Sequence, residues 1–165
     1  MKKGLILAAV LCLPIWCSAT TLQKLTLPEL RDHAVSVVVA RVADLRYQSF
    51  NGRIWTIVEL QVENALKGNS SGRVHFRIPG GMRSVNGRTL VTQVDGVPEI
   101  RDGERGIFFL ETRPPAFADL VGWNQGFYRL IEKNGKQYVL RSDTARSSQT
   151  LDQFLIEFQK GSINK

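Results

Sequence analysis

A regular alternation of side chains between Ile54 and Glu63 constrains the fold of this chain more than any other feature. One face of the segment carries apolar side chains and a threonine, namely Ile54, Thr56, Val58, Leu60 and Val62. The other face carries Glu59, Gln61 and Glu63. A period of two over ten residues is typical of a strand with one buried face and one solvated face. The sequence therefore predicts a domain built on a β-sheet.

Four more strands are predicted around this one, followed by a separate β-hairpin. The strands are Ser36–Leu45, Arg73–Ile78, Arg88–Val94 and Gly106–Glu111, and the first of them is rich enough in valine to be buried on both faces at its start. The hairpin joins 126–131 to 136–141 through Asn134-Gly135, the strongest short-range hairpin signal. We expect a mainly β fold, a five-stranded OB-like antiparallel barrel with an added hairpin. An open antiparallel sheet or a sandwich is the alternative.

Two helices are predicted to flank the strands. Thr26 and Glu29 form a capping box that starts a short N-terminal helix over Leu27–Ala34. Apolar residues recur at helical spacing over Leu151–Phe158, which indicates a C-terminal amphipathic helix capped by Ser148-Gln149-Thr150 and packed on the body. Residues 161–165 are expected to fray.

The first nineteen residues are typical of a cleaved signal peptide. Two lysines precede an apolar stretch over Gly4–Ile15, and small residues at 18 and 19 predict cleavage after Ala19. Residues 20–165 then form one exported domain, periplasmic or secreted and not transmembrane. A lipoprotein signal at Cys17 is the alternative, although Trp16 is too large for the position before the lipidated cysteine. Both cysteines leave with the leader, so no disulfide is expected.

Three segments carry a resemblance to a known family. They are SVVVARVADL from Ser36, WTIVELQVENALKG from Trp55 and RVHFRIPGG from Arg73. With Asp102-Gly103-Glu104 before an apolar strand, they resemble the netrin and tissue-inhibitor-of-metalloproteinase type of OB-like barrel, and most closely secreted bacterial proteins of unassigned function. The resemblance covers roughly residues 25–110. In the animal inhibitors an N-terminal cysteine chelates the metal of the target; this mature chain has no such cysteine, so the resemblance implies the fold without that chemistry.

The sequence contains no pattern that specifies a reaction. The two histidines, His33 and His75, have no spacing that pairs them, and no cysteine remains to complete a metal site. No serine lies in a nucleophile elbow, and the carboxylates that could act as acid and base fall in predicted turns. We therefore predict a protein that is not an enzyme and that has no cofactor and no metal. A hydrolase whose site the sequence does not reveal is kept as an alternative, ranked third after the two binding functions given below.

Two segments are candidates for binding. Gly80-Gly81 lets the backbone approach a partner closely or simply make a turn, and Arg83 and Arg88 would line the edge of this loop. Trp123 and Asn124 pair an aromatic ring with an amide, which suits a sugar or a protein hot spot unless Trp123 plugs one end of the barrel. The predicted binding residues are thus Gly80, Gly81, Arg83, Arg88, Trp123 and Asn124, with a loop over 86–103 folded across the barrel mouth.

Charge limits the class of partner. The whole chain has a formal net charge of +7, with many arginines in the middle third of the sequence. Export makes nucleic acid an unexpected ligand, although OB-like barrels often bind it. We expect a protein partner in the cell envelope or outside the cell. The alternative is a basic surface that binds anionic glycan or lipid.

Overall fold

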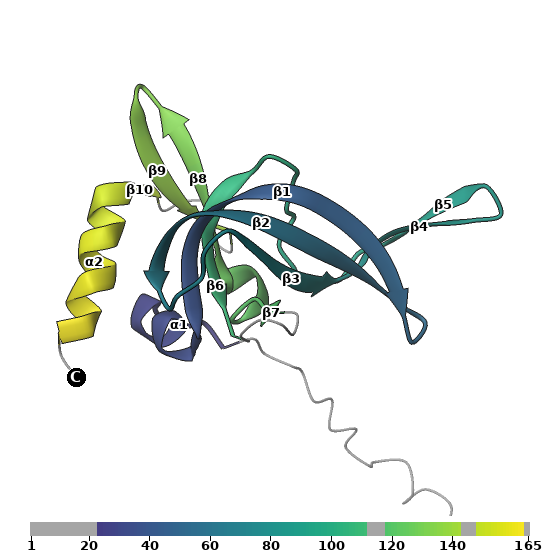
Figure 1. Ribbon diagram of the computed structural model, residues 1–165, viewed down its shortest axis with the longest axis horizontal. Helices are drawn as coiled ribbons and strands as arrows, with labels where there is room; N and C mark the ends of the chain where they lie inside the picture. Colours follow the sequence, from purple (N-terminus) through teal and green to yellow (C-terminus); the bar gives the residue numbers. More distant parts are fainter. Residues whose placement is uncertain (1–22, 112–117, 143–147, 164–165) are drawn as a thin grey trace, which may run out of the picture.

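The computed structural model describes residues 23–111, 118–142 and 148–163 and shows a mainly β protein (Figure 1). The predicted leader and its cleavage site lie outside the described residues. In chain order the elements are α1 (Leu27–His33), β1 (Ser36–Phe50), β2 (Arg53–Lys67), β3 (Arg73–Pro79), β4 (Gly81–Val85), β5 (Arg88–Thr92), β6 (Arg105–Leu110), β7 (Ala118–Asp119), the 3-10 turn η1 (Trp123–Gly126), β8 (Phe127–Lys133), β9 (Lys136–Arg141), β10 (Ser148–Thr150) and α2 (Leu151–Ile163).

Eight of these strands form one curled sheet in the order β10-β9-β8-β6-β1-β2-β3-β7 (Figure 1). All pairings are antiparallel except the one between β3 and β7, where Phe76 lies opposite Ala118. One residue beyond β7, Leu120 bridges Leu110 at the end of β6. Hydrogen bonds from Glu111 N–H to Asp119 O (3.0 Å) and from Val121 N–H to Phe109 O (3.0 Å) flank this bridge. The sheet thus curls back on itself, with β7 between β3 and β6.

The observed sheet differs from the predicted five-stranded barrel in two ways. The hairpin β8–β9 and the strand β10 extend the sheet beyond β6, and one of the five predicted strands is not part of it. Arg88–Val94 was expected to be the fourth barrel strand, but β5 pairs only with β4, in a two-stranded sheet of its own. Figure 1 shows this hairpin extending away from the body, so the predicted loop over 86–103 does not fold across a barrel mouth as a whole. The place beside β3 is taken by the two-residue strand β7, which is too short to leave a periodic pattern in the sequence.

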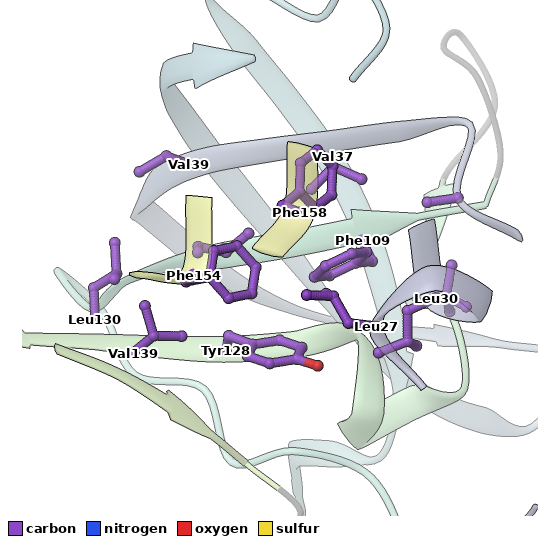
Figure 2. Packing of buried hydrophobic residues seen from close by; sticks show 13 residues of the cluster. Leu27, Leu30, Val37, Val39, Phe109, Tyr128, Leu130, Val139, Phe154 and Phe158 are labelled. Atoms are coloured by element: carbon purple, nitrogen blue, oxygen red, sulfur yellow. The ribbon is translucent and has the colours of Figure 1, made fainter. Parts of the chain in front are cut away.

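Two cores lie on opposite faces of β1 and β6. Within β1, Val37 and Val39 point to the first core, whereas Val38 and Ala40 point to the second. The first core packs the sheet against both helices, with Phe109 of β6 and Phe154 of α2 among its rings (Figure 2). The second core fills the inside of the curled sheet. The prediction that β1 is buried on both faces at its start is confirmed.

Both helices begin as the sequence indicates. Glu29 accepts a hydrogen bond from the backbone N–H of Thr26 at 2.7 Å, which completes the capping box of α1. Thr150 and Gln153 form the equivalent pair at the start of α2. α2 continues to Ile163 rather than ending near Phe158, so the helix includes the first three residues of the segment that was predicted to fray; residues 164–165 lie outside the described part.

Three hairpins turn on the same dipeptide. Asn51-Gly52, Asn86-Gly87 and Asn134-Gly135 each form a two-residue loop with both φ angles positive. This is the geometry of a type I′ turn, whose twist matches that of the flanking strands. The hairpin predicted at Asn134-Gly135 is confirmed as β8–β9.

Candidate functional site

A cleft of about 240 Å³ lies at the base of the β4–β5 hairpin. Its apolar wall consists of two tryptophans, two prolines and three aliphatic side chains, namely Trp55, Trp123, Pro79, Pro98, Ile78, Val97 and Leu120. Arg77, Glu111 and Asp119 supply the polar part of the lining. The cleft therefore combines aromatic surface with a small number of charged groups, the composition typical of a recognition pocket.

Sheet pairing positions one side of the cleft. Trp55 on β2 lies directly opposite Pro79 on β3, and Arg77 is two residues earlier on the same strand. The guanidinium carbon of Arg77 lies 4.7 Å from the centre of the Trp55 ring. The Nε of Arg77 donates to Asp119 Oδ1 on β7 at 3.1 Å. Stacking and ion pairing together fix the arginine, so the floor of the cleft has a defined shape.

Trp123 closes the other side of the cleft in a strained conformation. Its φ is 58°, in the left-handed region that a bulky residue rarely adopts, and its side chain remains 43% exposed. The next residue, Asn124, donates its backbone N–H to Gly96 O at 3.2 Å. Buried Gln125 bonds the N-terminal segment through Leu25 N–H (2.7 Å) and Gln23 O (2.9 Å). Backbone strain of this kind, held by its surroundings, is concentrated at functional sites.

The structure divides the predicted binding residues into two groups. Trp123 lines the cleft, and Gly80 follows the cleft residue Pro79 directly. Asn124 adjoins the cleft through its backbone. Arg83 and Arg88 lie instead along the projecting hairpin, exposed on β4 and β5.

Gly80 and Gly81 are packed closely against other residues of this chain. A Cβ on Gly80 would lie 2.7 Å from the carbonyl oxygen of Thr92, and one on Gly81 would lie 2.6 Å from the Tyr47 ring and 2.7 Å from Thr56 Oγ1. Both residues have positive φ, 96° and 134°. In this structure their small size sets the angle at which the hairpin leaves β3.

Sequence reasoning missed most of the cleft. The alternation over 54–63 predicts that Trp55 lies on the outward face of its strand, yet nothing in its spacing links it to Trp123. Arg77 and Asp119 meet only because β7 pairs with β3. The one usable signal was the alternation itself, which puts Trp55 and Arg77 on outward faces of neighbouring strands.

A separate polar cluster surrounds Glu59 on the outer face of the sheet. The carboxylate side chain is only 7% exposed and pairs with Arg46, Arg73 and His75. The hydrogen bond from His75 Nε2 (3.0 Å) and the nearby Arg73 guanidinium hold the pKa of Glu59 below its usual value, although burial opposes them. Every polar atom of this carboxylate is thus occupied by protein partners, which is the arrangement of a structural ion network.

The described part of the chain contains neither a cluster of metal-ligating side chains nor a membrane-spanning helix. Within residues 23–111, 118–142 and 148–163, no three His, Cys, Asp or Glu side chains gather as metal ligands. No helix in the same ranges has the length and apolar character to cross a bilayer.

No family model, curated protein or solved structure matches this chain. The likeness to netrin-type OB-like barrels therefore stays a prediction.

Proposed function

We propose that this chain is an exported, non-enzymatic binding domain with an OB-like barrel, and that it recognises another protein through the cleft between Trp55 and Trp123. The circuit of β1, β2, β3, β7 and β6 supports the OB-like assignment, because it places five strands around one core. The observation that carries the function is the strained, half-exposed Trp123 facing a preformed apolar cleft.

The size of the cleft favours a protein partner. A volume of about 240 Å³ is below the roughly 300–1,000 Å³ of pockets that enclose a small molecule. It suits one anchoring side chain of a larger partner, packed between two tryptophans and two prolines. Two of the three charged lining residues support the same conclusion, since Arg77 is already engaged with Asp119 and Trp55. These contacts favour recognition over a hydrolytic reaction.

Photo-crosslinking from inside the cleft tests the proposal. A benzoylphenylalanine at Trp123 preserves an aromatic ring there, and the same group at Ile156, which is exposed on α2, is the matched control. We expect one protein to be crosslinked from position 123 and not from position 156. With that protein purified, Trp55→Ala and Trp123→Gly should each raise the Kd by about thirtyfold or more, as expected for hot-spot residues.

The same variant separates binding from folding. Trp123→Gly removes the strain of the left-handed residue as well as its partial burial, so the free energy of unfolding should stay within about 1 kcal/mol of the wild-type value. If Trp123 instead plugged the barrel as a buried side chain, its replacement would lower the free energy of unfolding, measured in urea, by about 3–5 kcal/mol. A large loss of stability, or equal crosslinking from positions 123 and 156, contradicts the proposed role of the cleft.

A further inference from the structure

Exposed apolar side chains gather at the ends of two hairpins. We define the hairpin tips as residues 47–53, at the end of β1–β2, and residues 82–91, in β4–β5. Six of the nine large apolar side chains exposed in the described residues lie there: Tyr47, Phe50, Met82, Val85, Leu90 and Val91. Figure 1 shows both tips extending toward the same end of the molecule, away from α1 and α2. Such a concentration on one end marks an interaction surface.

The arginines of the tips differ from those of the body. Eight described arginines elsewhere, including Arg46 at the edge of the first tip, form ion pairs with carboxylates. Arg53, Arg83 and Arg88 form none with any described residue. No Asp or Glu occurs in residues 45–57 or 79–94. The tips therefore carry positive charge that no carboxylate among the described residues neutralises.

Charge and apolar side chains are interleaved on the β4–β5 hairpin. Met82 lies opposite Val91 on one face, with no charge beside them. On the other face Arg83 lies opposite Leu90, and Val85 lies opposite Arg88. The hairpin thus has one uncharged face, where Ser84 and Thr89 lie beside Met82 and Val91, and one face on which guanidinium groups lie next to aliphatic side chains.

We propose that the two hairpin tips dock the domain on the surface of an anionic phospholipid bilayer. Apolar side chains on an interfacial element enter the boundary between headgroups and acyl chains by about 5–10 Å, and basic side chains at the same depth attract the lipid phosphates. Phe50 and Val91, the most exposed of the six, lie on different hairpin tips. A fluid bilayer surface can accommodate two separate tips without a preformed cavity for each. The three unpaired arginines supply the complementary charge.

Vesicle binding tests this inference directly. Residues 20–165, which include every residue that the structure describes, are sedimented with vesicles of equimolar phosphatidylglycerol and phosphatidylcholine, and with vesicles of phosphatidylcholine alone. We expect binding to the anionic vesicles only. The triple change Arg53→Gln, Arg83→Gln, Arg88→Gln should weaken it roughly a hundredfold, because each basic side chain near an anionic surface contributes about 1 kcal/mol.

The third Asn-Gly hairpin provides the matched control. Ile131→Ser, Lys133→Gln, Lys136→Gln removes one exposed apolar and two basic side chains from β8–β9, and vesicle binding should change less than about twofold. Circular dichroism checks that both triple variants fold. Equal loss of binding in the tip and control variants would show a general charge effect and overturn the assignment to the tips.

A label reports whether the tips enter the bilayer. Because residues 20–165 contain no cysteine, a single Phe50→Cys or Val91→Cys can carry an environment-sensitive fluorophore. We expect a blue shift on anionic vesicles from both positions and none from Ile131→Cys. Absence of the shift, or of binding, overturns the proposal, and tips that instead crosslink a protein would assign them to a protein interface. Cleft variants such as Trp123→Gly should still bind vesicles, so failure of one proposal leaves the other open to its own test.

Discussion

The hairpins β8–β9 and β4–β5 begin from the same turn and reach opposite environments. Both use Asn-Gly with two positive φ angles. β8–β9 is flanked by β6 and β10, and its Leu130 and Val139 are buried. No other described strand pairs with β4–β5, and nine of its ten strand residues are exposed. Turn chemistry therefore specifies that a hairpin forms, but it does not specify whether the hairpin joins the sheet.

The difference follows from how apolar residues are distributed. In β8–β9, Leu130 and Val139 are opposite each other and share one buried face. In β4–β5, Met82 and Val91 lie on one face while Leu90 lies on the other, beside Arg83. Burying the face of Leu90 would bury the charged Arg83 beside it, and burying the face of Met82 and Val91 would leave Leu90 exposed on the other face. A hairpin of this kind remains exposed on both faces.

The sharpest test of this comparison is the same substitution in both hairpins. Leu130 is 8% exposed and Leu90 is 45% exposed. Leu130→Ala should lower the free energy of unfolding by about 2–4 kcal/mol, because it leaves a cavity in the core, and Leu90→Ala by less than about 1 kcal/mol. Urea unfolding followed by circular dichroism gives both values. Equal losses would show that β4–β5 is packed in solution and would remove the contrast.

The attachment of the projecting hairpin gives a somewhat smaller effect. Gly81→Ala places a Cβ against Tyr47 and Thr56 at positive φ and should cost about 2–3 kcal/mol. Gly52→Ala, also at positive φ but with no atom within 4 Å of the added Cβ, should cost about 1 kcal/mol. The comparison is read from thermal unfolding of the two variants. A Gly81→Ala variant as stable as Gly52→Ala would mean that the hairpin base is loose.

The smallest expected effect concerns the paired charges of the body. The pKa of Glu59 lies below its ordinary value of 4.5, chiefly because His75 donates a hydrogen bond to it. The unfolded chain thus binds the proton more readily than the folded one between the two pKa values, so stability rises with pH there. The contribution is complete above about pH 4.5 and is lost as pH falls through the folded pKa.

Glu59→Gln should therefore flatten the acid side of the stability curve. The charged and titratable groups facing this carboxylate are Arg46, Arg73 and His75, with Asp44 opposite it on β1. Urea midpoints measured between pH 3 and pH 7 provide the test, and Glu132→Gln at an exposed position of β8 is the control. If the urea midpoint of Glu59→Gln depended on pH as that of the wild-type protein does, the loss of stability in acid would come from other carboxylates.

Local signals in the sequence predicted individual elements well. The capping box of Thr26 and Glu29 and the turn at Asn134-Gly135 each act over a few residues, and both are confirmed. The alternation over Ile54–Glu63 is confirmed as a strand, but Glu59, which was predicted on the solvated face, is only 5% exposed because arginine and histidine side chains cover it. Asn51-Gly52 and Asn86-Gly87 carry the same signal as Asn134-Gly135 and could have been used in the same way. Applied to the second, it would have paired the predicted strand Arg88–Val94 with the residues just before the turn, without deciding whether that hairpin joins the sheet.

Sheet order and the cleft depended on contacts between distant residues. β7 has two residues, and its partner β3 lies about forty residues earlier in the chain, so no periodic pattern connects them. Trp55 and Trp123 reach one cleft only after β3, β7 and η1 are assembled. The tips could be found from composition, since they lack acidic residues, but their exposure depends on which strands remain without neighbours.

The placement of β1 and β6 between two cores has a consequence for how the protein unfolds. Adjacent residues such as Val37 and Val38 serve opposite cores, so neither strand can separate from one core without disturbing the other. Helix α2 and the inside of the curled sheet are thereby coupled, although they do not share side chains. The sheet and helices that share these cores should lose their structure in a single cooperative transition. Among the described hairpins, β4–β5 contributes to neither core, so partial opening should begin there before it reaches β8–β9.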